Sequence, residues 1–302
     1  MSDIKLYYNN IDIYNEVSVC ALVHEMHAEK RADSLTIRFN DVHNLWAGWK
    51  PERGDQIQLK YSDDDSGVMY VNELNAVNGL FTIRALSTYN VQKIKKTRSW
   101  EGISLIMLIS QIASELGLSY KCYGITNQIY KYISQENETN FEFLERICMY
   151  ESCSFNVYNK SIVVYSEPYI ESSSSGTIKV GINGVFDYDI SGYLATGCTV
   201  TNGKISGTYA VSDEKIILKN APATSKGEAE RFARGIPRSC NKNAVKGRIT
   251  KSLCTNFSAG SILNLTTPKA SLWDRKIFIT CIRHDFVMNR SDIYFRECLE
   301  GY

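Results

Sequence analysis

The feature that most constrains the fold of this chain is a pattern of short β-strands that occurs twice. The first copy runs from Gly54 to Leu86 and the second from Gly260 to Leu299. Each copy begins with a glycine, continues with a short apolar strand and a loop, and ends in a longer hairpin. A duplicated unit presents two similar surfaces, so three such chains could imitate a six-fold ring. Two hairpins can also share a pattern by chance, and the sequence alone leaves that alternative open.

Three strands of the first copy correspond to three strands of the second. In the first copy, a polar loop with the run Ser62 to Gly67 separates the first two strands and is typical of an exposed hairpin tip. Its clustered aspartates lack the alternating ligands and the following bidentate acid that a calcium loop needs. The alignment is 54–59 with 260–265, 69–74 with 277–282, and 81–86 with 294–299.

Apolar and polar residues alternate along these strands and along the strands that precede the first copy. The chain from Glu16 to about Thr88 has a β pattern throughout. We expect the apolar positions to form β-barrel core or subunit interface, because both arrangements remove sheet edges that would otherwise aggregate. The predicted core or interface residues are Leu35, Ile37, Phe39, Ile57, Leu59, Ile83, Leu263, Leu265, Ile277, Ile279 and Phe295.

Composition excludes several classes of protein. A chain of 302 residues with 44% hydrophobic and 22% charged residues is typical of a globular protein with two or three domains. A net charge of +1 gives no electrostatic footprint for sequence-specific nucleic acid binding or for an anionic membrane. No apolar run could span a membrane, and the N-terminus lacks an apolar signal core, so we expect synthesis in a cytosol. The nine cysteines contain no Cys-x-x-Cys, and we expect reduced, structural thiols.

Two helices have clear start and stop signals. Ser104 can cap a helix over 105–116, whose apolar residues form one stripe. Ser225 can cap a later helix, and we expect Gly235 and Pro237 to end it.

Between these two helices the sequence predicts a third helix and a hairpin. Thr139 and Glu142 form a capping box, in which the hydroxyl and the carboxylate each satisfy a free backbone amide, and the helix should run to about Glu151. A hairpin over 154–165 should turn at Asn159, because asparagine tolerates the positive φ of a tight turn.

These patterns divide the chain into four parts and predict an α+β fold that is mainly β. We expect a first β domain at 1–90 and an α+β insert domain, with two helices and a hairpin, at 91–167. A Ser/Gly-rich linker at 168–183 offers little apolar surface to bury, and a second β domain with one helix follows at 184–302; the resemblance described next implies that both β domains are tube domains.

Two segments resemble the late control protein D family of phage tails, which are the baseplate central hub proteins of contractile tails. The segment 98–105 contains Ser-Trp-Glu-Gly-Ile-Ser-Leu, which matches the Ser-Trp-x-Gly-x-Ser/Thr-Leu start of the family's first helix. The segment 135–147 contains Gln-Glu-Asn-Glu-Thr, followed by Phe-Leu-Glu-Arg, and is similar to the start of the second helix. The hairpin follows in the expected order, and the resemblance extends over nearly the whole chain.

The resemblance implies a fold, an assembly and partners. Two β-barrel-like tube domains per chain would flank the α+β insert, and a homotrimer would form a pseudo-hexameric ring. Such a ring adapts the hexameric tail tube protein to the trimeric central spike protein, with the tape measure protein and the baseplate wedge proteins as further neighbours. The implied location is the tail baseplate of a virion or a phage-like particle, assembled in the bacterial host cytoplasm. Some members continue into a lysozyme-like segment, and because the sequence ends soon after its last strand pattern, we expect none here.

The histidines and cysteines do not predict a metal site. His24 and His27 lie three residues apart in a strand pattern, so their side chains should point to opposite faces of the sheet. Cys148 and Cys153 flank the end of a helix, where nearby Glu151 should raise rather than lower the pKa of a thiol. We therefore expect no metal, no cofactor and no reactive cysteine.

No motif of a hydrolase, a phosphate-binding loop or a dinucleotide-binding fold occurs. Glu142 and Glu145 could be imagined as a glycosidase pair, but the capping role already explains Glu142. The four tryptophans could stack on sugars, although tryptophan more often fills a core or an interface. We therefore predict a non-enzymatic baseplate hub with no catalytic residues. A module that binds cell-wall carbohydrate, or less favourably a hydrolase, remains the alternative.

Overall fold

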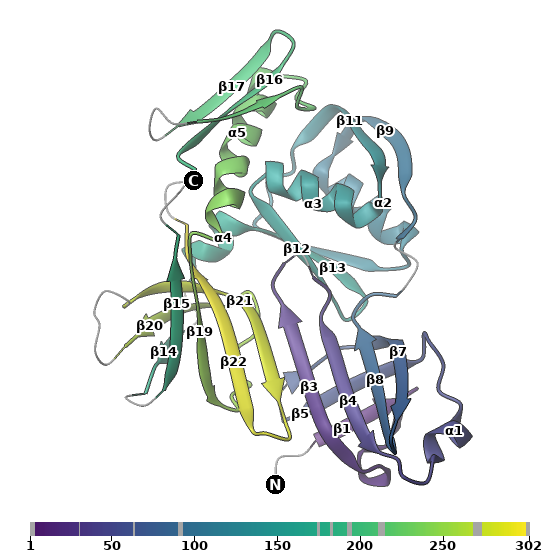
Figure 1. Cartoon of the computed structure of the whole chain (residues 1–302). Helices are drawn as coiled ribbons and strands as arrows, with labels where there is room; N and C mark the ends of the chain where they lie inside the picture. The colour runs from purple at the N-terminus through teal and green to yellow at the C-terminus, as the bar shows by residue number, and fades with distance from the viewer. Residues whose placement is uncertain are drawn as a thin grey trace.

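The structure is a computed structural model that describes residues 4–29, 31–62, 64–89, 93–173, 176–181, 184–191, 195–210, 215–267 and 274–299. Two β-sheets lie side by side at one end of the molecule, and an α+β region lies over them (Figure 1). The described residues are mainly β, as the sequence predicts, and form five α-helices, two more than the sequence predicts. None of these helices is long and apolar enough to cross a membrane.

The first sheet comes from the N-terminal part of the chain. It surrounds a cluster of buried apolar side chains. A short helix, α1, interrupts the predicted run of strands. The elements are β1 (Ile4–Tyr8), β2 (Ile11–Asp12), a 3₁₀ turn (Tyr14–Glu16), β3 (Val19–His27), β4 (Ser34–Asn40), α1 (Leu45–Trp49), β5 (Gln56–Tyr61), β6 (Asp64–Asp65), β7 (Met69–Val77) and β8 (Leu80–Leu86).

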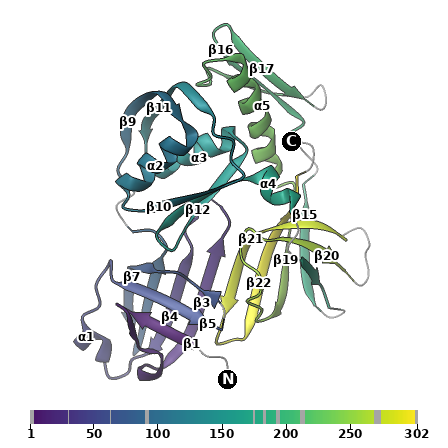
Figure 2. The same ribbon diagram turned by 180° about the vertical axis from the view of Figure 1, so that it is seen from behind.

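The middle of the chain forms the α+β region. Helices α2 and α3 lie between the β9–β11 pair and the β10–β13–β12 sheet (Figure 2). The elements are β9 (Lys96–Ser104), α2 (Leu105–Glu115), β10 (Ser119–Tyr123), β11 (Ile129–Glu138), α3 (Asn140–Tyr150), β12 (Cys153–Tyr158), β13 (Ser161–Ser166) and α4 (Glu167–Ser172).

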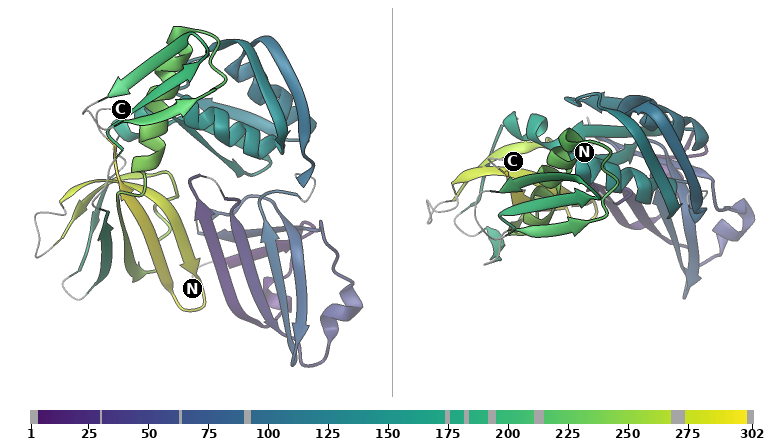
Figure 3. Two further views of the ribbon diagram at one scale, coloured as in Figure 1. Left: turned by 45° about the horizontal axis from the view of Figure 1, so that its top comes forward. Right: turned by 90° about the horizontal axis from the view of Figure 1, so that it is seen from above.

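The C-terminal part supplies the second sheet and also extends the α+β region. Helix α5 packs along β16 and β17, away from the second sheet (Figure 3). The elements are β14 (Gly176–Lys179), β15 (Val185–Ile190), β16 (Gly197–Asn202), β17 (Ile205–Ala210), β18 (Ile216–Lys219), α5 (Lys226–Asn241), β19 (Val245–Ser252), β20 (Ile262–Thr266), β21 (Arg275–Asp285) and β22 (Arg290–Glu297).

The two sheets have the same strand connectivity. The order across the first is β5-β7-β8-β4-β3, and the order across the second is β20-β21-β22-β19-β15. Every neighbouring pair in both orders is antiparallel. The strands also follow one another along the chain in the same sequence, so each strand of one sheet has a counterpart in the other. The predicted duplication is confirmed.

The correspondence extends to single residues. Gly54 and Gly260 have φ values of +97° and +90°, which favour glycine. Their amides donate to the carbonyls of Val71 and Ile279, each over 2.8 Å. Directly after these two residues, β7 and β21 each have a register shift in their pairing with the next strand. Val71 and Ile279 therefore occupy the same place in the two sheets.

The predicted alignment of the third strand is wrong by three residues. Arg84 lies opposite Glu73, and Tyr294 lies opposite Cys281, so Tyr294 corresponds to Arg84 and not to Phe81. The turn has two residues between β7 and β8 and four between β21 and β22, so the second copy has an insertion of two residues where the predicted alignment required five. The polar start of β22 also hides the beginning of that strand from a hydrophobic pattern.

The two sheets are continuous with each other. Strand β3 pairs with β21 in antiparallel register, which joins the sheets into one path of strands. Over the described residues no strand pairing closes either half into a barrel. The structure therefore has two joined sheets in place of the β-barrel form that the resemblance implies, and the tube domains stay a prediction.

The capping signals of the middle region are confirmed. The Ser104 side chain accepts from the backbone amide of Met107 at the start of α2. Thr139 and Glu142 form the capping box at the start of α3. Asn159, in the turn between β12 and β13, has a φ of +44°.

Helix α5 does not end where the sequence predicts. It continues through Gly235 and Pro237 to Asn241. A Cβ atom at Gly235 would lie 2.2 Å from the carbonyl oxygen of Met149 in α3. This glycine therefore permits close packing of α3 and α5 and does not terminate the helix.

The linear boundaries do not coincide with the hydrophobic cores. The predicted linker 168–183 contains most of α4 and all of β14, which pairs in parallel with β20. The segment 197–241, inside the predicted second tube domain, shares one core with the α+β insert. The α+β region is therefore built from two separate stretches of the chain.

Candidate functional site

The eleven residues predicted as core or interface all lie inside the two sheets. Each is at most 2% exposed in the single chain. Six lie in the core of the first sheet and five in the core of the second. Their contribution to the interior is therefore made within one chain, and a role in subunit contacts stays a prediction.

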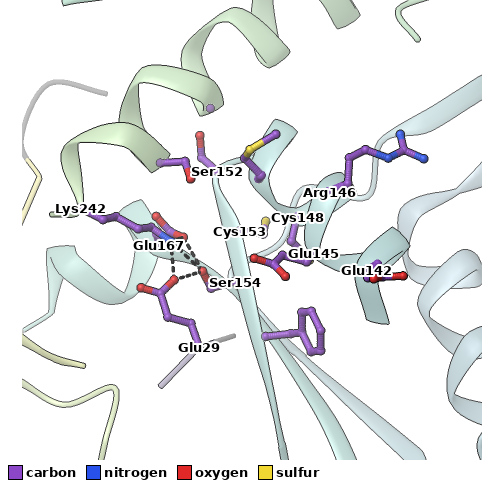
Figure 4. Close-up of a pocket in the computed structure, with 14 residues that line it drawn as sticks. Glu29, Glu142, Glu145, Arg146, Cys148, Ser152, Cys153, Ser154, Glu167 and Lys242 are labelled. Carbon is purple, nitrogen blue, oxygen red and sulfur yellow. Dashed lines mark hydrogen bonds and ion pairs between the residues drawn. The ribbon is translucent and has the colours of Figure 1, made fainter. Parts of the chain in front are cut away.

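A buried charged cluster lies where the two sheets meet the α+β region. Its centre is Lys242, at the end of α5, whose ammonium contacts Glu29 and Glu167 (Figure 4). Lys242 Nζ also donates to Ser154 Oγ over 3.0 Å, and Ser154 in turn donates to Glu29 over 2.6 Å. We call Glu29, Ser154, Glu167 and Lys242, together with Glu171, Arg238 and Arg296, the junction cluster.

The other half of the junction cluster ties α4 to the second sheet. Arg238 Nε is 2.9 Å from Glu167 Oε2, and its Nη2 is 2.7 Å from Glu171 Oε1. Arg296, from β22, is 2.7 Å from the same Glu171 oxygen. Glu171 also accepts from the amide of Leu299 over 2.7 Å. One carboxylate therefore connects two helices and the last strand.

The junction cluster is electrostatically matched. Burial alone would raise the pKa of Glu167, but Lys242, Arg296 and Arg238 outweigh it, and the pKa lies below its usual range. Arg238 and Arg296 are 1% and 2% exposed. Buried charges of this kind add little net stability as a set, but loss of one member leaves another uncompensated. The cluster thus fixes how the three regions are arranged.

A cavity of about 250 Å³ beside the junction cluster is the strongest candidate for an active site. Ser154 and Lys242 face it, as do Glu142 and Glu145 (Figure 4). If Lys242 were the base of a Ser154 nucleophile, its amine would have to be free, whereas its three hydrogen-bond donors go to Glu29, Glu167 and Ser154.

The carboxylate of Glu142 and the thiols of Cys148 and Cys153 also line this cavity, and their surroundings favour structural roles. Glu142 accepts from the Thr139 amide over 2.7 Å in the capping box. Burial raises the pKa of Cys148 and Cys153, and Glu151 raises that of Cys153 further. These thiols are therefore poor nucleophiles. The arrangement supports a structural junction.

The two predicted strand histidines have separate environments. His24 is fully buried and lies opposite His284 across the β3–β21 pairing. Burial lowers the pKa of His284 to about 4, and its Nδ1 is 2.8 Å from Ser291 Oγ. His27 instead lies 2.9 Å from Glu25. His24 and His27 therefore have different neighbours in the structure.

One group of side chains could hold a metal ion. The ligand atoms of Glu25, His27 and Cys281 lie within 4.8 Å of one another at the β3–β21 pairing. A thiol, an imidazole and a carboxylate suit zinc. However, burial, followed by the charges of Glu25 and Asp33, raises the pKa of Cys281 to about 12. The sequence could not predict this group, because Cys281 joins it from the other sheet.

Two of the four tryptophans stack on phenylalanine rings. Trp46 stacks on Phe81 in the first sheet, with ring centroids 5.1 Å apart. Trp100 stacks on Phe143 in the α+β region. Trp49 is 48% exposed, and Trp273 lies outside the described residues.

Sequence reasoning missed the junction cluster, although a signal was present. Glu167 and Glu171 are four residues apart, as are Arg238 and Lys242, so each pair lies on one helical face. The acidic pair was hidden because its segment was predicted to be a linker. The basic pair was hidden because the helix was predicted to end before it.

Comparison with known proteins gives structural matches only: no family model and no curated protein matches the sequence. The 43 kDa tail protein of prophage MuSo2 from Shewanella oneidensis has a TM-score of 0.77 at 12% identity, over 98% of each chain. A tail protein from Neisseria meningitidis MC58 also has a TM-score of 0.77, at 9% identity, over 98% of this chain and 96% of that one.

A third match comes from a secretion system. It is an Escherichia coli component of the type VI secretion system, described as structurally similar to the T4 tail proteins gp27 and gp5. Its TM-score is 0.62 at 10% identity, over 99% of this chain and 78% of that one. Over nearly its whole length, the chain therefore has the fold of phage tail proteins.

Proposed function

We propose that the chain is a structural baseplate hub of a contractile phage tail or a related particle, and not an enzyme. Three copies would form a pseudo-hexameric ring between the six-fold tail tube and the three-fold central spike. The tape measure and wedge proteins would be further neighbours, and the chain would reside in the tail baseplate.

The observation that carries this proposal is the duplicated sheet. Two sheets with one connectivity, one bulge position and one glycine conformation give a single chain two similar surfaces. A trimer of such chains is the simplest closed assembly that presents six similar surfaces with only three-fold symmetry. The shared fold with phage tail proteins supports the same assignment.

The test is the mass and symmetry of the purified full chain, alone and mixed with a trimeric central spike protein from the same particle. Light scattering gives the mass, and averaged electron micrographs give the symmetry. We expect a trimer and a three-fold ring with six similar lobes. A chain that remains monomeric under both conditions would exclude the hub function and favour a cell-wall-binding module.

A further inference from the structure

We infer that, in the assembled ring, the outer edge of β15 in one chain pairs with β7 of the next chain, with Ile190 opposite Leu74. This inference rests on the proposed trimer and specifies the contact that closes it. The occupant of each edge is a second copy of this chain.

The first step is the contact between the two sheets within one chain. Strand β21 pairs with β20 over its first residues, Arg275 to Phe278. Beyond its bulge, over Cys281 to Asp285, the same side of β21 pairs with β3. The last strand of the first sheet therefore docks on the second strand of the second sheet.

The second step concerns the two strands that correspond to β3 and β21, because each of them has an exposed edge. The counterpart of β3 is β15, which pairs with β19 and, among the described residues, ends the path of strands. The counterpart of β21 is β7, and among the described residues its part beyond the bulge pairs with β8 alone. Ile190 and Val77, on these two edges, are 57% and 56% exposed. Exposed strand edges of this kind attract another strand.

The third step transfers the register from one sheet to the other. Ile37 lies opposite Ile83 in the first sheet, and Ile249 lies opposite Ile293 in the second. Ile83 directly precedes Arg84, and Ile293 directly precedes Tyr294, the residues already shown to correspond. The two Ile–Ile pairs are therefore equivalent.

The next strands follow from these pairs. Leu22 lies opposite Ile37 in β4, and Phe186 lies opposite Ile249 in β19. Leu22 and Phe186 are therefore equivalent, and Met26 and Ile190 lie four residues further along each strand.

The internal contact then gives the partner of Ile190. Met26 lies opposite Ile282, the third residue after Ile279 at the bulge of β21. Leu74 holds the same place after the bulge of β7. Ile190 of one chain should therefore lie opposite Leu74 of the next.

The chemistry of this register is favourable. Leu74 and Ile190 would form an apolar pair on the inner face, as Met26 and Ile282 do. A small residue, Ala76, would lie opposite the larger Tyr188. No two like charges face each other over these four positions. The full register is Leu74 with Ile190, Asn75 with Asp189, Ala76 with Tyr188, and Val77 with Asp187.

The test uses cysteine cross-linking in the full chain with the two exposed cysteines removed, Cys20→Ser and Cys240→Ser. One preparation carries Leu74→Cys and a second carries Ile190→Cys. The two are mixed, assembled and mildly oxidised, and the products are separated on a non-reducing gel. We expect cross-linked dimers in the mixture, at least tenfold more than in either preparation alone.

The matched control replaces Ile190→Cys with Asp189→Cys. A shift by one residue moves the side chain to the opposite face of the sheet, so this pair should cross-link far less. Ile190→Asp should also dissociate the ring, whereas Ile217→Asp, at a 65% exposed position on β18, should not.

The outcomes separate this inference from the proposed function. A trimer whose Leu74 and Ile190 cysteines cross-link no better than the shifted pair would overturn the edge pairing and leave the hub function standing. A chain that stays monomeric with its spike partner would overturn both.

Discussion

The two sheets share one backbone frame but fill it with different side chains. In the first sheet Leu35 lies opposite Ala85. At the equivalent place in the second sheet, Gly247 lies opposite Phe295. A Cβ atom at Gly247 would lie 2.4 Å from the Phe295 ring. The larger and the smaller residue of the pair have therefore exchanged strands, and the combined side-chain volume of the pair is similar in the two sheets. We expect a change of size at one residue alone to destabilise the fold.

The sheets also differ in how they contact the α+β region. Leu86 lies opposite Tyr70 in the first sheet, and its counterpart Arg296 lies opposite Phe278 in the second. Arg296 stacks on Phe278, with its guanidinium 4.3 Å from the ring centroid, and binds Glu171. Only the second sheet therefore contributes a strand residue to the junction cluster.

The largest expected effect comes from Arg296→Leu, which places in the second sheet the residue type that the first sheet has at the equivalent position, Leu86. The substitution leaves Glu171 and Glu167 with one cation fewer in a buried site, and it should lower the free energy of unfolding by about 3–5 kcal/mol. Urea denaturation measures this. The control Leu86→Ala, at the half-buried counterpart, should cost about 1 kcal/mol. If both substitutions lowered the free energy of unfolding equally, the contacts of Arg296 in the junction cluster would not make the second sheet differ from the first.

The next largest effect is a dependence of folding stability on pH, which arises from Asp33 beside the first sheet. Asp33 is 3% exposed, and burial raises its pKa to about 6, although its carboxylate accepts from the His27 amide over 2.7 Å. The folded chain therefore holds this proton where the unfolded chain has lost it. Stability from Asp33 should fall as the pH rises from about 4 to about 6, by up to about 3 kcal/mol.

Asp33→Asn should remove this slope, because the amide keeps the acceptor and does not titrate. Urea midpoints of both proteins at several pH values make the comparison. Glu167 should act in the opposite sense: its pKa is lowered, so its contribution is present at neutral pH and is lost as the pH falls below about 4. A slope that survives in Asp33→Asn would assign it to another group.

A smaller effect tests the exchanged pair directly. Gly247→Ala should cost about 1–3 kcal/mol by overpacking against Phe295. In Phe295→Ala the same glycine substitution should cost less, because the ring that it meets is gone. A double-mutant cycle on urea denaturation gives the coupling. Strict additivity would show that the carbonyl of Asp187, 2.6 Å from the same Cβ position, causes the whole effect.

The smallest effect compares the two glycines that begin the repeat. Gly54→Ala and Gly260→Ala should each cost about 1 kcal/mol, because both positions have a positive φ. A Cβ atom at Gly54 would lie 2.8 Å from the Tyr89 ring, whereas at Gly260 no atom beyond the chain neighbours lies within 4 Å. Thermal unfolding should therefore show a larger loss for Gly54→Ala, and the reverse order would contradict the structural difference.

Local signals allowed much of the fold to be predicted. The capping residues at Ser104 and Thr139 and the turn at Asn159 act within a few residues, and the structure has all three. The repeat was recognisable because a glycine before an alternating strand is a local pattern. The third strand was misaligned because turn length, which sets its register, has no fixed hydrophobic signature.

The junction cluster could not be predicted, because its members meet only through the tertiary fold. Lys242 and Glu29 are 213 residues apart. Gly235 was misread as a helix end because close helix packing and helix termination both favour glycine. A sequence shows that a residue lacks a side chain but does not show which neighbour requires its absence.

The junction cluster also has a consequence for the order of folding. Within the α+β region, Glu167 and Glu171 of α4 pair with Arg238 and Lys242 at the end of α5, whereas Glu29 comes from the loop after β3 and Arg296 from β22. Glu29 and Arg296 therefore lack their partners until both sheets have docked on the α+β region, and these contacts close long stretches of chain. We therefore expect the two sheets to reach their final positions late in folding, so that Arg296→Leu should speed unfolding more than it slows folding.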